Sequence, residues 1–130
     1  MSPQRHDRVM AITSHLPHLI AYNIVSTAAD LENVTKSDII KYSASGFRDF
    51  TRIASSDPTM WRDIFLNNKE AVLEMISRFT EDLTALQKLI RWEDGKSLHK
   101  LFSKTRKVRG KIISAGQDTV DADFGRSKKR

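Results

Sequence analysis

The 130-residue sequence contains no cysteine, and this absence excludes several kinds of protein. Without thiols there is neither a disulfide framework nor a thiolate metal site, so the chain needs no particular redox compartment. Long apolar runs are also lacking: the longest, residues 16–25, is too short and too often interrupted by polar side chains to span a bilayer. No apolar core of the signal-peptide type follows Met1. We therefore expect a cytoplasmic protein without a membrane segment.

Acidic residues are missing from one stretch near the C-terminus. The net charge is +6, and the excess lies mainly in residues 96–111 and in the closing basic residues, whereas the middle of the chain is nearly balanced. Clustered cations are what phosphate contacts require, so a nucleic-acid surface is one interpretation. However, Phe102 is the only Phe, Tyr or Trp in this stretch, and no helix-turn-helix pattern is present. The sequence thus favours a solvated helix face and a protein without a nucleic-acid partner.

Motifs for cofactors, metals and nucleophiles are absent as well. We find no G-x-G-x-x-G, no P-loop and no nucleophile elbow in the sequence. Neither HExxH nor the Glu-x-x-His pair of di-iron bundles occurs, so we predict no metal site. No segment alternates between apolar and polar residues over a useful length. These absences indicate an all-α chain that contributes a site to a larger assembly and is not a complete catalyst.

Helical periodicity predicts one domain at residues 1–117 and a disordered basic tail at 118–130. Ser2 followed by Pro3 is typical of a helix N-terminus, because serine caps an unpaired amide and proline loses no useful donor there. A long N-terminal helix should follow. Pro17 lies inside its apolar pattern and removes a backbone donor, so we expect a kink near this residue.

Further helices are expected along the rest of the chain. Short helices are predicted at about 37–42 and 47–55. A long central helix should begin at Pro58 and end near Gly95, and one more amphipathic helix should fold back at about 98–112. The apolar stripe of the central helix comprises Trp61, Ile64, Phe65, Val72, Ile76, Phe79, Leu83, Leu86 and Ile90. Its alternating steps of four and three from Val72 onward are typical of helix-on-helix packing, within one chain or between subunits.

Three charged residues gather in the stretch GFRDFTRIA, residues 46–54. On a helix, Arg48, Asp49 and Arg52 share one side, because residues three and four apart are neighbours. Two arginines at this spacing repel each other unless an anion lies between them. Asp49 is one candidate anion, and a bound carboxylate held by two parallel hydrogen bonds is another. The alternative is an ion-pair cluster that ties this helix to its neighbours.

Two histidines and a tyrosine lie on one face of the N-terminal helix. His15, His18 and Tyr22 are separated by three and four residues, and the nearby Pro17 reorients the turn between them. Such places often line a site. Three interpretations remain open for the histidines: a hydrogen-bonded pair at an interface, a substrate contact, or half of a metal site.

Both tryptophans occupy the predicted central helix. Trp61 follows Pro58 in the first turn, where tryptophan usually packs in a core; an aromatic wall beside a ligand, or a subunit contact, is the functional interpretation. Trp92, near the other end, is predicted to pack.

Three motifs in order resemble a known family. TSHLPH at 13–18, GFRDFTRIA at 46–54 and SDPTMWRDIF at 56–65 closely resemble the C-terminal helical domain of the prephenate dehydrogenase family, which includes arogenate and cyclohexadienyl dehydrogenases. The resemblance runs from about residue 5 to residue 101. It implies a helical dimerisation domain from an enzyme of tyrosine biosynthesis, whose N-terminal Rossmann domain binds NAD or NADP and supplies the catalytic histidine. That first domain is not part of this sequence.

The resemblance also implies roles for particular residues. Arg52, the arginine of TRIA, becomes the partner of a substrate carboxylate, and His18 becomes a pocket residue. Trp61 is expected to reach the pocket from the neighbouring subunit of a homodimer. Asp49 and Gly46 match positions that shape the same corner, although many relatives have a longer glycine run before the phenylalanine. His15 and Arg48 are added to the candidate pocket from their neighbourhood.

Prephenate carries two carboxylates, so an electropositive pocket walled by aromatic side chains is what this dianion requires. Arg52, with Arg48 beside it, would supply the positive charge. We expect the chain alone to be inactive, either as a fragment of an enzyme that acts on prephenate or arogenate, or as a stand-alone dimerisation or regulatory module. The preceding reading frame would distinguish these two hypotheses.

Overall fold

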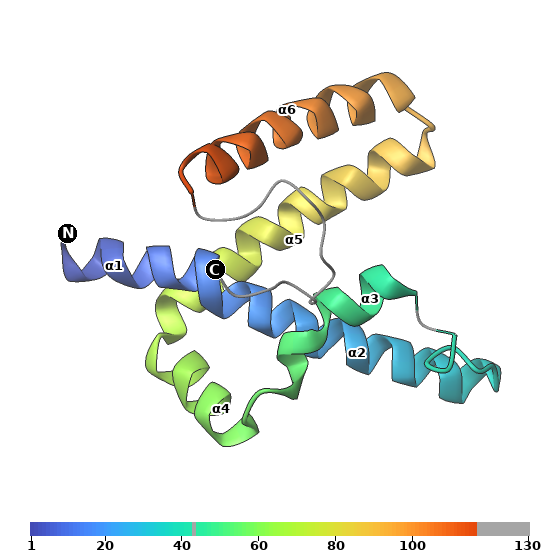
Figure 1. Ribbon diagram of the computed structural model, residues 1–130, viewed down its shortest axis with the longest axis horizontal. Coiled ribbons are helices and arrows are strands. Elements are labelled where there is room, and N and C mark those ends of the chain that lie inside the picture. Colours follow the sequence, from blue (N-terminus) through green and yellow to red (C-terminus); the bar gives the residue numbers. More distant parts are fainter. Residues whose placement is uncertain (43, 117–130) are drawn as a thin grey trace. The chain divides into compact units, whose positions relative to one another are not determined.

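The computed structural model describes residues 1–42 and 44–116, and the predicted tail at 118–130 lies outside them. Within the described residues all regular structure is helical (Figure 1), which confirms the all-α prediction. The elements are α1 (Pro3–Met10), the π-helical turn η1 (Ala11–His15), α2 (Leu16–Thr35), α3 (Ser45–Phe50), the 3-10 segment η2 (Arg52–Ser55), α4 (Pro58–Asn67), α5 (Lys69–Arg91) and α6 (Gly95–Ser114). The described residues form two compact units, 1–76 and 77–116.

A long N-terminal helix is formed by α1, η1 and α2 together (Figure 1), as predicted. It begins where Ser2 accepts a hydrogen bond from the Arg5 amide at 3.2 Å. Its irregularity is a π-helical turn that ends two residues before Pro17, with the Leu16 amide bonded to the Ala11 carbonyl. Because Pro17 has no amide hydrogen, a regular α-helical register would be interrupted at this point, and the wider turn accommodates the missing donor.

The core of the first unit lies between the N-terminal helix and the first turns of α5. Its buried residues are Ala11, Leu16, Ala71, Val72 and Met75, with Leu19, Ile20 and Ile76 packed against them. Ala11 is fully buried, and its small side chain lets the two helices approach closely. This packing holds η1, which ends at His15, and the first turn of α2, which contains His18, against α5.

The chain after α2 differs from the prediction. Lys36 adopts a left-handed conformation with φ of 59° and ends the helix. The predicted helix at 37–42 is wrong, since only turns occur there. The Glu32 carboxylate accepts a hydrogen bond from the Ile40 amide at 3.2 Å, which pairs the backbone of this segment with a side chain of α2.

The predicted helix at 47–55 exists as two pieces, α3 and η2. Thr51 separates them, with φ of −91° and ψ of 4°. Its hydroxyl donates to the Phe47 carbonyl at 2.7 Å, in the back-bonding geometry that loosens a helix. Arg48 and Arg52 therefore lie on two different segments, α3 and η2. The prediction had placed both arginines on one side of a single helix.

The long central helix is also divided, into α4 and α5. Asn68 leaves the helical conformation, with φ of −112° and ψ of 37°, and its side chain bonds instead to the N-terminal helix. The start at Pro58 is as predicted, with Asp57 accepting from the Thr59 amide at 3.2 Å. A single helix across residues 58–91 was thus a wrong expectation, because tertiary hydrogen bonds compete with the helix at this position.

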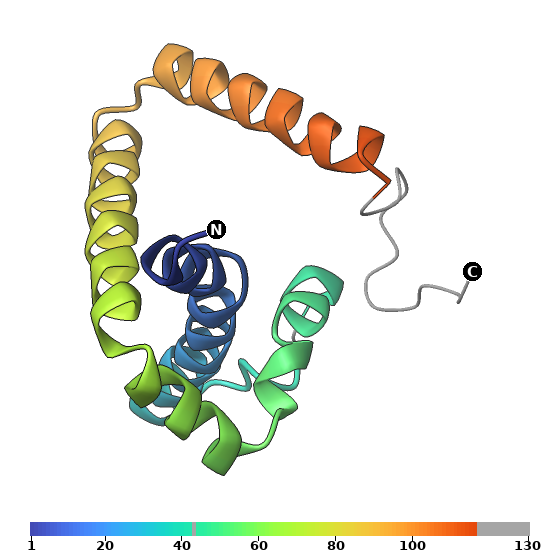
Figure 2. The same cartoon turned by 90° about the vertical axis from the view of Figure 1, so that its left-hand side faces the viewer.

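In the second unit, α6 begins at a corner after the end of α5 and diverges from α5 along its length (Figure 2). Glu93 turns the chain with φ of 55°, and Asp94 caps α6 through the Ser97 amide and hydroxyl at 3.0 and 2.7 Å. Gly95 begins a helix and does not end one. No residue of α6 is buried. Within residues 1–42 and 44–116, no helix has the length and apolar character needed to cross a membrane.

Candidate functional site

Two histidines and a tryptophan form a stack in the first unit. The Trp61 indole lies flat on the His18 imidazole, with ring centroids 3.6 Å apart and planes inclined by 15°. The His15 ring meets the same indole edge-on at 6.2 Å and 79°. Trp61 is only 7% exposed. Spacing explains this arrangement, since the histidines are three residues apart on one helix face and Pro58 starts α4 so that its first turn faces them.

The resemblance led us to expect Trp61 to enter the pocket from a neighbouring subunit. Within a single chain the indole already covers its own His18, so these two rings meet without a second copy. Trp61 is buried, as a tryptophan in a core usually is, whereas the prediction that Trp92 packs is wrong, because Trp92 is 68% exposed. We refer to His15, His18 and Trp61 as the imidazole–indole stack.

Each imidazole of the stack has its own hydrogen-bond partner. His18 Nδ1 lies 2.9 Å from the Ser14 carbonyl oxygen, and His15 Nδ1 lies 3.2 Å from Nδ2 of Asn68. Burial lowers the pKa of His15, and the nearby His18 lowers it further, while Asp7 acts in the opposite direction. Burial and the neighbouring His18 thus favour the neutral form of His15 by lowering its pKa.

Arg52 lies on η2, which packs on α2. The Tyr22 hydroxyl, one turn after His18, donates to the Ser56 carbonyl at 2.8 Å and ties the end of this segment to α2. The Arg52 side chain is exposed, and within residues 1–42 and 44–116 it forms no hydrogen bond or ion pair. The alternative of a structural ion-pair cluster thus has no support from Arg52 in this structure.

The remaining predicted site residues lie on α3. Asp49 is half-buried, and its Oδ1 is enclosed without a hydrogen-bond partner in the described structure. Among the described residues, no salt bridge joins Asp49 to Arg52. Gly46 lies in the first turn, where an added Cβ would meet nothing within 4 Å. The space beside Gly46 is therefore open, and the fold of this chain does not require glycine there.

Sequence reasoning missed Asn68, which joins α4 to the N-terminal helix. Its Nδ2 donates to the Asp7 carbonyl at 2.9 Å and approaches His15 Nδ1 from the same position. The available signal was spacing: Asn68 follows Trp61 by seven residues, two helical turns, and so shares its face of α4. A cavity of about 330 Å³ lies here, lined by His6, Asp7, Met10, His15, Ile64, Asn67 and Asn68. In the described ranges, no three His, Asp or Glu side chains are grouped to hold a metal ion.

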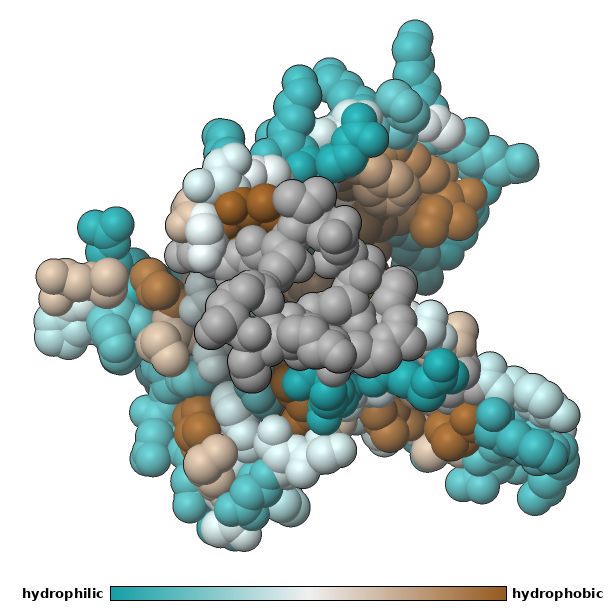
Figure 3. Space-filling model, in the orientation of Figure 1, coloured by the Kyte–Doolittle hydropathy of each residue, from teal (hydrophilic) through white to brown (hydrophobic). Residues whose placement is uncertain are grey.

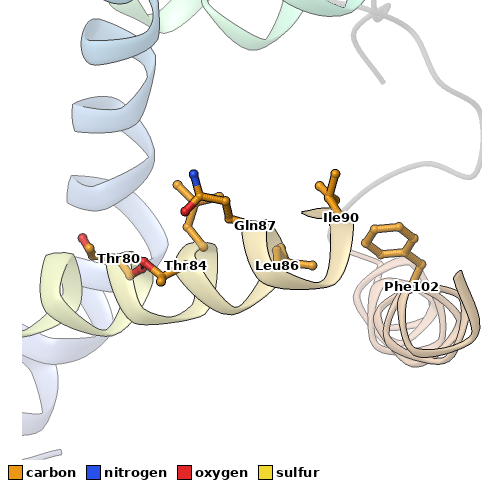
Figure 4. A pocket seen from close by; sticks show the side chains of 7 residues that line it. Thr80, Thr84, Leu86, Gln87, Ile90 and Phe102 are labelled. Atoms are coloured by element: carbon orange, nitrogen blue, oxygen red, sulfur yellow. The ribbon is translucent and has the colours of Figure 1, made fainter. Parts of the chain in front are cut away.

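A second feature is an apolar groove in the unit from Ser77 on. It has a volume of about 420 Å³ (Figure 4) and is lined by Thr80, Leu83, Thr84, Leu86, Gln87, Ile90 and Phe102. Leu83, Ile90 and Phe102 are each more than half exposed. Hydrophobic side chains gather over the region where α5 ends and α6 begins (Figure 3). Exposed apolar surface of this extent is typical of a protein interface.

Together these features define a class of protein: a helical domain with an imidazole–indole stack, an exposed apolar groove and, in its sequence, no dinucleotide-binding motif. Residues 2–104 match the family model described as "Prephenate dehydrogenase, dimerization domain". The chain therefore belongs to this family, and the resemblance seen in its motifs is confirmed.

Known relatives agree with this assignment. The chain is 42% identical over 109 residues to the cyclohexadienyl dehydrogenase of Zymomonas mobilis, and 37% identical to the prephenate dehydrogenase of Bacillus subtilis. These matches cover 84% of this chain but only 37% and 29% of the relatives, so it spans about a third of their length.

Solved structures show the same fold. Prephenate dehydrogenase from Aquifex aeolicus, in complex with hydroxyphenyl propionate and NAD+, superimposes with a TM-score of 0.80 at 44% identity, covering 86% of this chain and 39% of that one. Arogenate dehydrogenase from Synechocystis gives a TM-score of 0.74 at 26% identity, covering 86% and 41%.

Proposed function

We propose that this chain is the substrate-binding and dimerisation domain of an NAD(P)-dependent dehydrogenase that oxidatively decarboxylates prephenate or arogenate on the way to tyrosine. The observation that carries the proposal is Arg52: an exposed guanidinium, without an ion pair in the described chain, on a segment tied to the helix that bears His18. A guanidinium without a protein partner can pair with a ligand carboxylate through two parallel hydrogen bonds.

The imidazole–indole stack complements this cation. A substrate that has a ring and carboxylates would need aromatic side chains and a positive charge in one pocket, and Tyr22 ties the Arg52 segment to the helix that bears His18. Loss of carbon dioxide from prephenate gives an aromatic product, so the reaction depends on positioning the ring and its carboxylates. Arg52 would bind and orient a carboxylate, and Trp61 with His18 would limit the access of water to the ring.

A dinucleotide does not fit the described part of this chain. Residues 1–42 and 44–116 contain no strand, and the sequence has no G-x-G-x-x-G at a strand-to-helix turn, which is how Rossmann domains cradle a pyrophosphate. NAD or NADP would supply the hydride acceptor from a separate Rossmann domain. We therefore expect no dehydrogenase activity from the purified chain alone.

A chimera tests the proposal. The matching C-terminal part of the Zymomonas mobilis cyclohexadienyl dehydrogenase, 42% identical, would be replaced by this chain. We expect the chimera to reduce NAD+ or NADP+ when prephenate or arogenate is added, and the chain alone to show no turnover. A chimera that folds and binds the dinucleotide but turns over neither substrate would contradict the enzymatic function and favour a stand-alone module.

We further propose that the chain dimerises through the groove of its second unit. The spacing of the central stripe, residues 61–90, is compatible with packing within the chain or between subunits. Its first part is occupied within the chain, because Trp61 and Val72 are 7% and 5% exposed. The part that remains available is the groove from Thr80 to Ile90 with Phe102. The description of the family model as a dimerization domain supports a second copy as the partner.

A further inference from the structure

We propose that Asn68 is a positioning residue of the pocket, which holds His15 as the tautomer protonated at Nε2, while the Ser14 carbonyl holds His18 as the opposite tautomer. The role of these rings in substrate binding rests on the proposed function; the tautomers themselves do not.

The orientation of the Asn68 amide follows from the Asp7 carbonyl. A carbonyl oxygen only accepts hydrogen bonds, so the Asn68 atom 2.9 Å from it must be the NH2 group. That same nitrogen lies 3.2 Å from His15 Nδ1 and has a second hydrogen to donate. His15 Nδ1 must then be the acceptor, and its ring proton resides on Nε2.

The hydrogen-bond partner of His18, the Ser14 carbonyl, requires the opposite tautomer. His18 Nδ1 lies 2.9 Å from the Ser14 carbonyl oxygen, so Nδ1 carries the hydrogen and donates it. In the neutral ring, Nε2 of His18 is then a bare acceptor. A neutral His15 can therefore donate from Nε2, whereas a neutral His18 can only accept there.

This division has a consequence for a carboxylate ligand. A carboxylate meets a donor at Nε2 of neutral His15, but at His18 it meets a donor only after that ring gains a proton. Asn68 also disfavours the charged form of His15, since an imidazolium would place one N–H against another. The charged and titratable groups around this ring are Asp7, His6 and His18, and the lowered pKa of His15 agrees with a neutral ring.

Asn68 also fixes where the His15 ring lies. Its donor holds Nδ1 from one side, and the edge of the ring rests on the Trp61 indole, whose face covers His18. Both ends of α4 thus act on one imidazole: Trp61 in the first turn and Asn68 just after the last. Loss of the Asn68 amide should release the tautomer and the ring together, while the backbone bond of His18 remains.

Long-range 1H–15N correlation of the imidazoles in the full 15N-labelled chain, at about pH 8 and so above the ordinary histidine pKa, tests the tautomers directly. We expect His15 protonated at Nε2 and His18 at Nδ1. Asn68→Ala should give His15 mixed tautomers, and Asn68→Asp should shift its proton to Nδ1, since a carboxylate accepts there. His18 should be unchanged in both variants. Asn33→Asp is the matched control, because Asn33 is exposed on α2, lies outside the cavity at His15 and has no side-chain hydrogen bond in the described chain.

The proposal is overturned if wild-type His15 carries its proton on Nδ1, or if Asn68→Ala leaves its tautomer unchanged. Wild type alone decides the first point even if a variant does not fold. In the chimera, Asn68→Ala should raise the KM for prephenate by about fivefold, and Asn33→Asp by less than about twofold. Altered tautomers with an unchanged KM would refute the positioning role. An inactive chimera would count against the proposed enzyme and leave the tautomer result standing.

Discussion

The two parts of α5 carry one apolar stripe but have different surroundings. In the first turns, Val72 is 5% exposed and Met75 8%, packed against the N-terminal helix. Further along the same helix, Leu83 is 54% exposed and Ile90 64%. The residue types and their spacing are alike in both parts. Packing partners within the chain therefore decide which part of a regular stripe becomes core, and the rest is left as surface for another molecule.

The comparison extends to function. The first unit contains the stack, the Arg52 segment and all the polar tethers between helices that we describe, so its side chains are held in defined positions. In the second unit, α6 buries no residue, and its groove is open and apolar. The first unit therefore holds its polar and aromatic side chains in defined positions, while the second presents an exposed apolar groove.

The largest effect should come from Trp61→Ala. Removing a buried indole leaves a cavity and breaks the stack, so we expect the free energy of unfolding to fall by about 3–5 kcal/mol in urea denaturation followed by circular dichroism. Trp92→Ala, in the other unit, should change it by less than about 0.5 kcal/mol because that side chain is 68% exposed. If both variants lose the same free energy of unfolding, the difference in packing that we describe between the two units is contradicted.

Arg52→Ala in the chimera should act on catalysis and not on stability. Loss of a bidentate partner for the substrate carboxylate should lower kcat/KM for prephenate by the equivalent of about 2–5 kcal/mol. The KM for the dinucleotide should hardly move. Arg52→Lys should lie between wild type and alanine, because lysine restores the charge without the planar fork. A destabilised variant with near-normal kcat/KM per folded molecule would rule out the substrate role.

Leu83→Asp should weaken the dimer and leave the first unit intact. A carboxylate in the apolar groove would have to be desolvated on association, so we expect the dimer dissociation constant to rise by about 100-fold, or about 2.7 kcal/mol. Sedimentation velocity measures this change, with Ser77→Asp as a control of equal charge outside the groove. A wild-type chain that is monomeric at high micromolar concentration would contradict dimerisation itself.

The smallest effect concerns pH. The folded state lowers the pKa of His15 below its ordinary 6.5, so between the folded and unfolded pKa values the unfolded chain binds more protons. Stability from this group is therefore complete above pH 6.5 and is lost as the pH falls through the folded pKa. Denaturation at several pH values should show this decline, and His15→Gln should flatten it. If His15→Gln loses stability with falling pH as the wild type does, the proton responsible binds to a group other than His15.

Much of the fold was predictable from signals that act within a few residues. Ser2 and Asp57 cap their helices as predicted, because a side-chain oxygen reaches amides only two or three positions away. The irregularity before Pro17 follows from one missing donor. His18 and Trp61 were chosen as candidate pocket residues from the HLPH and SDPTMW motifs, and the structure brings their rings into contact.

The wrong predictions share a physical cause. Asn68 breaks the central helix because its side chain bonds to Asp7 and His15, which lie more than 50 positions earlier in the chain. The segment after Lys36 forms turns and not a helix, with one of its amides bonded to the Glu32 carboxylate. Asp94 caps α6, although Asp94-Gly95 was predicted to end the preceding helix. In each case a side-chain hydrogen bond stabilises one of two backbone conformations whose intrinsic energies are similar.

The sequence by itself determined that this chain is helical, where most of its helices start, and which family it belongs to, since helix caps, prolines and contiguous motifs are local. Only the tertiary structure decided that Asn68 meets His15, that Trp61 covers His18 of the same chain, and that one end of a uniform stripe is buried while the other is exposed. These outcomes depend on which surfaces come together when the helices pack, and periodicity of 3.6 residues specifies a face without specifying its partner.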